Sequence, residues 1–265
     1  MAKGSLHRLR HGWAVQVRVI HALMIRELIT RFGRENIGFL WIMVEPLLFA
    51  VLVGIAWRLM HGPEEHGVSI IAFVVTGYLP LTLFRHAVMR AVRVFSVNSS
   101  LMYHRQIKVL DFVLVRFLIE VIGSMMAYLF IGILLMSLGE FPVPANLGLF
   151  LTGFFLYSLF TFSLCLILAP LSEYSDVLEK LIPVTTYVMI PFSGTFNMTS
   201  WLTPGIQDVM YYSPFVHAME MMRGGIFGGS VNAIYDWRVP FFTSMVFALI
   251  GLAMCRSVRA RLVVE

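Results

Sequence analysis

The sequence predicts an all-α membrane protein whose residues 1–265 form one domain with six transmembrane helices. Hydrophobic residues make up 58% of the chain and charged residues only 13%, whereas soluble domains carry about 25% charged residues. The apolar residues form long unbroken runs, with a mean hydropathy of +0.81. Such runs favour helices, because a helix satisfies its own backbone hydrogen bonds in lipid, and they exclude an outer-membrane barrel.

Six runs have the length that a membrane crossing needs. About 20 helical residues cross the hydrocarbon core, at a rise of about 1.5 Å each. We expect spans at 39–60, 68–84, 112–138, 147–171, 181–199 and 239–255. The second and sixth runs are short, so neighbouring residues must complete them.

The positions of the basic residues predict the orientation. With both termini in the cytoplasm, 16 Lys and Arg residues fall in inner segments and 2 in outer ones, as the positive-inside rule requires. Residues 1–38 and 256–265 are then cytoplasmic. Because the basic residues are concentrated in the predicted cytoplasmic segments, the net charge of +5 does not indicate nucleic-acid binding. The first apolar stretch is interrupted by Arg18, Arg26 and Glu27, so we expect the N-terminus to be retained.

Residues 13–32 predict an amphipathic helix on the cytoplasmic membrane surface. Its apolar residues recur at steps of three and four. A simple anchor beside the first span is the alternative. The apolar stripe consists of Trp13, Val17, Ile20, Met24 and Leu28.

The outer segment 200–238 predicts two short helices that are unable to cross the membrane. Thr203 before Pro204, and Ser213 before Pro214, each pair an N-cap residue with proline at the first helical position. The glycine pair 224–225 predicts the end of the second helix. The two helices suit a gate over a pathway, or a cap that only packs against the spans.

Two cytoplasmic loops predict short helices. Residues 98–100 can cap one through 102–108. Ser172 can cap another through 173–180, in which Asp176 and Lys180 are spaced for an i,i+4 ion pair. Such helices dock a soluble partner or serve only as connectors.

Charged residues inside the spans are candidates for function, because burying charge in lipid is costly. Glu45 lies in the first span, and Arg116 and Glu120 lie four residues apart in the third. Arg116 and Glu120 can neutralise each other along one helix face. Structural pairing and contact with a substrate remain alternative explanations.

Motifs for catalysis are absent from the sequence. The glycine-rich stretch 223–230 lacks the lysine of a P-loop, and neither H-E-x-x-H nor G-x-S-x-G occurs. His61, Glu64, Glu65 and His66 share one outer loop, and a solvated loop explains them better than a metal site. We therefore expect no catalytic residue, metal or cofactor in this chain, so any ATP hydrolysis requires another polypeptide.

The N-terminal part carries a family pattern. The run RELITRFGRENIGFLWIMVEPLL (26–48) resembles the entry to the first span in permeases of polysaccharide-exporting ABC transporters, the KpsM/Wzm type. The runs 171–197 and 201–228 resemble later signatures of that family, which often has Asn where this chain has Ser213. The matching residues of the first run are Arg26, Glu27, Arg31, Gly38, Trp41, Glu45 and Pro46.

The resemblance implies a permease for lipid-linked capsular polysaccharide in a bacterial inner membrane. It implies a homodimer with the channel at its interface, two copies of an ATPase that holds ATP and Mg, and periplasmic and outer-membrane export proteins. The surface helix is similar to the family's interface helix, and the pair within 200–238 to its periplasmic gate helices.

The resemblance also implies roles for single residues, with packing or interfacial anchoring as the alternative for each. The ATPase-coupling candidates are Met102, Tyr103, His104, Arg105, Glu173, Tyr174, Asp176 and Glu179. The channel or gate candidates are Trp41, Glu45, Tyr78, Arg116, Glu120, Trp201, Tyr211, Tyr212, Glu220 and Arg223.

Two other functions compete with this reading. A protein of the same fold can export O-antigen, a small lipid or a drug. An intramembrane enzyme acting on a glycolipid would use Glu45, His217 or Glu220.

Overall fold

The structure is a computed structural model that describes the backbone of residues 2–33, 38–102 and 106–262. Side chains are described for these residues except 2–9, 32, 38–43, 61, 65 and 259–262. Ten α-helices and one two-stranded hairpin make up the described fold, together with four short 3-10 helices. In chain order the elements are α1 (Ala2–Phe32), α2 (Gly38–His61), β1 (Glu64–Glu65), β2 (Val68–Ser69), α3 (Ile70–Ala91), α4 (Val94–Val97), η1 (Ser99–Leu101), α5 (Val109–Ser137), α6 (Leu147–Tyr174), α7 (Asp176–Val188), η2 (Pro191–Ser193), η3 (Thr199–Trp201), α8 (Pro204–Tyr211), α9 (Pro214–Phe227), η4 (Gly228–Ser230) and α10 (Arg238–Leu262).

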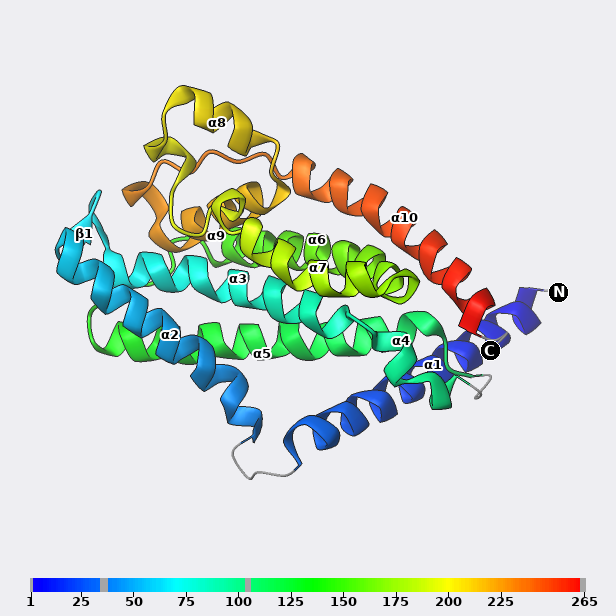
Figure 1. The fold of residues 1–265 in the computed structure, drawn as a ribbon. Helices are drawn as coiled ribbons and strands as arrows, with labels where there is room; N and C mark the ends of the chain where they lie inside the picture. The colour runs from blue at the N-terminus through cyan, green and yellow to red at the C-terminus, as the bar shows by residue number, and fades with distance from the viewer. Residues whose placement is uncertain (1, 34–37, 103–105, 263–265) are drawn as a thin grey trace.

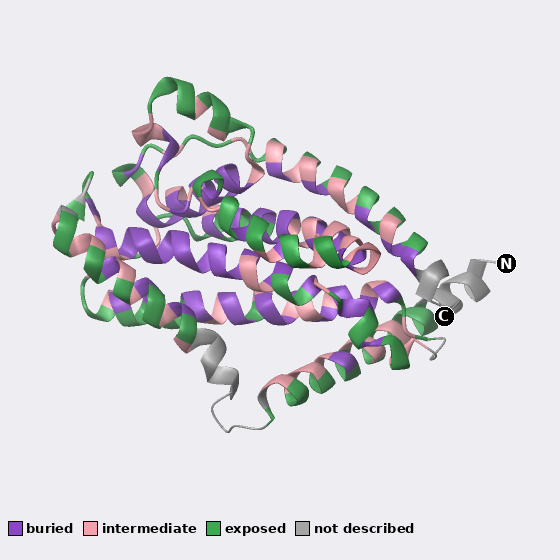
Figure 2. Cartoon of the chain, in the orientation of Figure 1, coloured by how far each residue is buried: buried purple, intermediate pink, exposed green. Residues whose placement is uncertain are grey.

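The long helices lie side by side, with α3 in the interior (Figure 1). α3 packs against α2, α5 and α6, while α6 packs along α9 and α10. Buried residues concentrate on α3, α5, α6 and α9, whereas α8 and the outer face of α10 are exposed (Figure 2). Both chain ends lie at the end of the bundle that carries α4, and α8 and the hairpin lie toward the other end (Figure 1).

Within the part of the chain that the structure describes, four helices are long and apolar enough to cross a membrane: α3, α5, α6 and α10. They correspond to the predicted spans at 68–84, 112–138, 147–171 and 239–255. The predicted span at 39–60 corresponds to α2, a helix of 24 residues. Pro46 and Pro80 lie inside α2 and α3 without ending them.

The predicted span at 181–199 is wrong in its bounds. α7 begins at Asp176 and ends at Val188, 13 residues later. Pro191 begins a single 3-10 turn, and Gly194 adopts a left-handed conformation with φ of +71°. The chain turns at these residues, so the predicted span is interrupted. Most of the predicted loop helix 173–180 joins the start of that span in α7, while residues 173–174 end α6.

The N-terminal helix α1 is longer than the predicted range 13–32. Its apolar stripe is divided: Ile20, Met24 and Leu28 pack against the core, whereas Trp13 is 72% exposed and Val17 48% exposed. The amide of Gln16 donates to Asp111 of α5 at 2.5 Å. The second half of α1 is thus a packed element of the bundle.

The predicted helix through 102–108 is wrong where the structure describes it, because Gln106–Lys108 are not helical and α5 begins at Val109. Asn98 begins only the 3-10 turn η1 and makes no side-chain cap bond there. Ser172 lies inside α6, and the side chain of Ser175 caps α7 instead, accepting from the Val177 amide at 3.2 Å.

The two outer helices begin where the sequence predicts, with Pro204 and Pro214 at their first positions. Neither Thr203 nor Ser213 makes a side-chain cap bond, however, and the Ser213 hydroxyl donates to the Phe192 carbonyl at 2.7 Å. α9 also continues through the glycine pair 224–225 and ends at Phe227, followed by the C-cap Gly228, where φ is +57°. The predicted stop was therefore placed too early.

Candidate functional site

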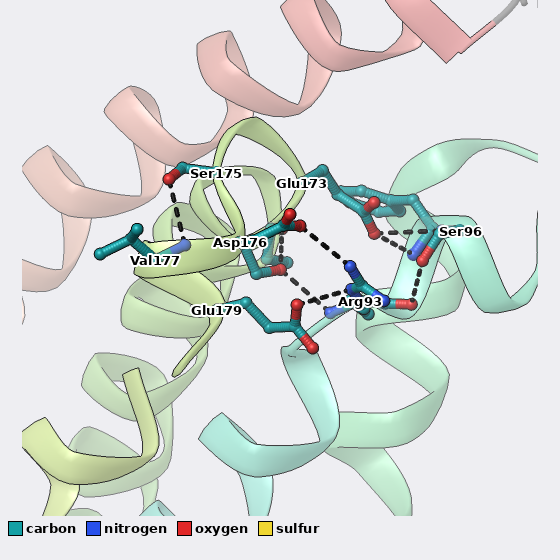
Figure 3. A network of polar contacts seen from close by, with 10 residues as sticks. Arg93, Ser96, Glu173, Ser175, Asp176, Val177 and Glu179 are labelled. Carbon is teal, nitrogen blue, oxygen red and sulfur yellow. Dashed lines mark hydrogen bonds and ion pairs between the residues drawn. The ribbon is translucent and has the colours of Figure 1, made fainter. Parts of the chain in front are cut away.

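The end of α3 is joined to the start of α7 by ion pairs from Arg93 (Figure 3). Its guanidinium lies 3.2 Å from the Asp176 carboxylate and 2.9 Å from that of Glu179. The Arg93 amide donates to the Ser172 hydroxyl at 3.0 Å. Arg93 therefore connects the turn between α3 and α4 to the junction of α6 and α7, where Ser172 lies 79 residues later in the sequence.

Glu173 adds a second connection at the same place. Its carboxylate accepts from the backbone amides of Phe95 at 3.2 Å and Ser96 at 3.0 Å (Figure 3). These amides belong to the first turn of α4, where helix amides lack partners within the helix. A carboxylate from α6 thus caps α4.

The ATPase-coupling candidates divide into three groups. Glu173, Asp176 and Glu179 meet around Arg93, and the Tyr174 hydroxyl lies 3.0 Å from that of Ser257 on α10. Met102 is half-buried and packs against the core. Tyr103, His104 and Arg105 lie outside the described residues.

The sequence did not identify Arg93 as a site residue. It was used there only as one of the basic residues that predict the orientation of the membrane helices. The predicted partner of Asp176 was Lys180, but the structure pairs Asp176 with Arg93. No local spacing relates residues 93 and 176, so only the packing of α3 against α7 reveals this contact.

Glu120 of α5 lies at the centre of a charged cluster. It is 2% exposed and forms an ion pair with Arg31 of α1. His86 and Arg90 of α3 approach the same carboxylate to 3.7 and 3.8 Å. Paired carboxylates are the form in which burial is tolerated.

The predicted pairing of Arg116 with Glu120 is wrong. Arg116 lies 3.1 Å from Glu27 of α1 and donates to the Arg90 carbonyl at 2.8 Å. Contacts between helices replace the i,i+4 pair, because both side chains point toward α1 and α3. These residues therefore fasten α1 to the bundle.

A polar and aromatic face extends over α2, α3 and α7. Glu45 is 56% exposed and lies 3.9 Å from His86. Tyr78 stacks on Phe49 with 4.7 Å between ring centres, and Arg85 lies 4.2 Å above the Tyr187 ring. An exposed carboxylate on an apolar helix such as α2 is costly against lipid tails and is tolerated beside protein or water. The side chain of Trp41, predicted here, lies outside the described set.

Arg223 and Glu220 are buried inside the outer segment rather than placed along an open path. Arg223 is fully buried and donates to the carbonyls of Gly194 at 2.7 Å, Asn197 at 3.0 Å and Thr195. Glu220 accepts from the amides of Thr199 at 2.6 Å and Ile234 at 3.1 Å. The two side chains thus satisfy non-helical backbone that follows α7 and, through Ile234, backbone that precedes α10.

The outer aromatic candidates differ in exposure. Trp201 is half-buried between His66 and Phe73, with ring centres 4.5 and 4.7 Å away. Tyr211 is the last residue of α8 and is 46% exposed. Tyr212, which follows it, is 82% exposed. Only the two tyrosines present a large free ring surface.

His217 joins α8 to the segment before α10. Its Nε2 lies 2.7 Å from the Tyr211 carbonyl, and its Nδ1 accepts from the Asp236 amide at 3.0 Å. This arrangement requires a neutral ring with its proton on Nε2. Burial lowers the pKa of His217 and so favours that neutral form. Among the residues searched, no three His, Cys, Asp or Glu side chains gather into a metal site.

Comparison with known proteins places this architecture in a family. The family model for the ABC-2 type transporter matches residues 18–227. The capsule polysaccharide export inner-membrane protein CtrC of Neisseria meningitidis serogroup B is 37% identical over 241 residues, 91% of each chain. BexB of Haemophilus influenzae, described in the same words, is 35% identical over 97% of each chain. The polysialic acid transport protein KpsM of Escherichia coli is 26% identical over 94% of this chain and 96% of its own.

These matches confirm the resemblance noted in the runs 26–48, 171–197 and 201–228. The family model covers more than half of the chain, and relatives above 30% identity align over more than nine-tenths of both sequences. The chain therefore belongs to the ABC-2 type transporter family.

Proposed function

We propose that this chain is the permease subunit of an ATP-driven exporter of lipid-linked capsular polysaccharide in a bacterial inner membrane. The observation that carries the proposal is its full-length likeness to capsule polysaccharide export inner-membrane proteins. Four of the described helices have the length and composition of membrane spans, which agrees with such a location.

The proposed assembly is a homodimer with two copies of a separate ATPase, which holds ATP and Mg. Periplasmic and outer-membrane export proteins continue the path. Each protomer has six crossings, made by α2, α3, α5, α6, the broken segment of α7 and residues 189–201, and α10. Both termini are cytoplasmic, which agrees with their position at one end of the bundle and with the distribution of Lys and Arg.

The proposed path follows the face that carries Glu45 and Tyr187, which are 56% and 58% exposed, beside the buried Tyr78. Exposed polar groups at membrane depth favour a water-filled route over a lipid contact. Sugar rings pack their C–H faces on aromatic rings, which allows a polymer to move without one fixed site. ATP-driven closure of the partner would push on the loops around Arg93 and shift α2 and α7, opening the outer gate.

The test is purification of the tagged chain in mild detergent from cells that make the capsule. We expect an ATPase subunit in stoichiometric amount, vanadate-sensitive hydrolysis, and intracellular capsule polymer when the gene is deleted. Accumulation of O-antigen instead would identify the other polysaccharide class. A homogeneous chain that turns over a glycolipid without ATP or a partner would contradict the proposal.

A further inference from the structure

We propose that Arg93 is a positioning residue that joins the cytoplasmic turn between α3 and α4 and the cytoplasmic junction of α6 and α7 into one docking unit for the ATPase. We call this unit the loop clamp, formed by Arg93, Ser172, Glu173, Asp176 and Glu179. Through the clamp, force applied to either loop moves α3 and α7 together. The inference rests on the proposed function, because it assigns the clamp to the ATPase-driven step.

The backbone at Arg93 is held in an unfavourable conformation. Its φ and ψ are 51° and 27°, in the left-handed region, between the end of α3 and the start of α4. Non-glycine residues rarely adopt this region. The neighbouring contacts from α6 hold it there: Ser172 accepts from the Arg93 amide, and Glu173 accepts from two amides of α4.

The side chain explains why an arginine occupies a position that suits glycine. The guanidinium reaches Asp176 and Glu179, both in the first turn of α7. Single exposed ion pairs contribute little, and Asp176 is 84% exposed. Glu179, however, is only 26% exposed, and the backbone bonds of Ser172 and Glu173 reinforce the pairs in one network.

A second contact extends the connection along the two helices. Arg85 of α3 lies over the ring of Tyr187 in α7. On α7, the two contact residues Glu179 and Tyr187 are about 12 Å apart along the helix axis. Because α3 and α7 are fastened at two points, a displacement of the loop clamp shifts both helices instead of bending one against the other.

The experiment measures polysaccharide exported per ATP hydrolysed by the complete complex in proteoliposomes. Arg93→Gly keeps the backbone conformation accessible and removes both ion pairs. We expect the ratio to fall about fivefold, because Arg93 no longer holds Asp176 and Glu179, with the ATPase still bound. Arg93→Lys keeps the charge without the planar fork, and we expect its ratio of export to ATP hydrolysis to lie between those of the wild type and Arg93→Gly.

The charge reversal Arg93→Glu with Glu179→Arg separates positioning from folding. We expect it to recover most of the ratio that Arg93→Glu alone loses. The matched control is Glu140→Gln, which breaks the ion pair with Arg58 (2.5 Å) away from the loops and should leave the ratio unchanged. An unchanged ratio in Arg93→Gly overturns the inference alone. A wild-type chain without any ATPase partner overturns the proposed function and the inference with it.

Discussion

Buried polar side chains in α9 bond to backbone groups of neighbouring segments. His217, Glu220 and Arg223 are at most 2% exposed. Their partners are carbonyls and amides of residues 194–199, 211, 234 and 236. These bonds explain how irregular backbone persists beside apolar helices, where unpaired polar groups are costly.

The neutral state of His217 predicts a pH-dependent stability of the outer segment. Protonation of Nδ1 would place a donor against the Asp236 amide and break that bond. Because burial lowers the pKa of His217, this contribution is fully present above about pH 6.5 and is lost as the pH falls through the lowered pKa.

Thermal unfolding of the protein in nanodiscs would measure this effect. We expect the wild-type Tm to drop between about pH 7.5 and pH 5, the range in which histidine titrates. His217→Gln should start lower and change less with pH. Parallel pH curves for the two proteins would count against a role for this ring.

The contact between α9 and α6 depends on glycine at 225. A Cβ there would lie 2.5 Å from the Phe150 amide nitrogen and 2.9 Å from the Asn146 carbonyl oxygen. Gly225→Ala improves helix propensity by about 1 kcal/mol, but the overlap is with backbone that cannot move aside. We expect a net loss of about 1 to 3 kcal/mol, seen as a lower Tm. Gly229→Ala is the matched control, since nothing lies within 4 Å of its Cβ.

Glu120 is predicted to hold α1 on the bundle. Glu120→Gln removes the charge that faces Arg31 and lies near His86 and Arg90. Breaking a buried pair costs about 3 kcal/mol or more, so the second half of α1 should open more often. Hydrogen exchange should rise at residues 26–32 and stay unchanged in α9. Equal exchange in Glu120→Gln and in the exposed control Glu64→Gln would contradict this.

The membrane topology can be tested with two exposed valines. Val143 lies between α5 and α6 and is 80% exposed, and Val177 in α7 is 65% exposed. In a background without the buried Cys165 and Cys255, Val143→Cys should react with an impermeant maleimide in intact spheroplasts. Val177→Cys should react only after permeabilisation. Labelling of both before permeabilisation would overturn the proposed orientation.

Much of the fold follows from the sequence because membrane spans and proline-initiated helices are local signals. Runs of apolar residues located α3, α5, α6 and α10, and Pro204 and Pro214 located the starts of α8 and α9. The end of α9 was misplaced, since the glycine at 225 permits close packing with α6, a function that its sequence neighbours do not distinguish from a stop.

The candidate site was only partly accessible from sequence. Glu173, Asp176 and Glu179 were singled out by family resemblance, whereas Arg93 had no local partner that would mark it. Arg116 and Glu120 were paired on spacing alone, but each bonds to α1. Spacing describes one helix, and these contacts arise between helices.

Hydropathy, charge distribution and motifs were enough to predict an α-helical membrane protein, an orientation from the positions of Lys and Arg, and the family. Hydropathy and charge are properties of single residues and short segments, so they can be evaluated without a structure. The structure was needed to find where α7 ends and which charged side chains pair, including Arg93 with Asp176 and Glu179. Those outcomes depend on which helix faces approach each other, because a buried or shared charge is stable only beside the partner that packing supplies.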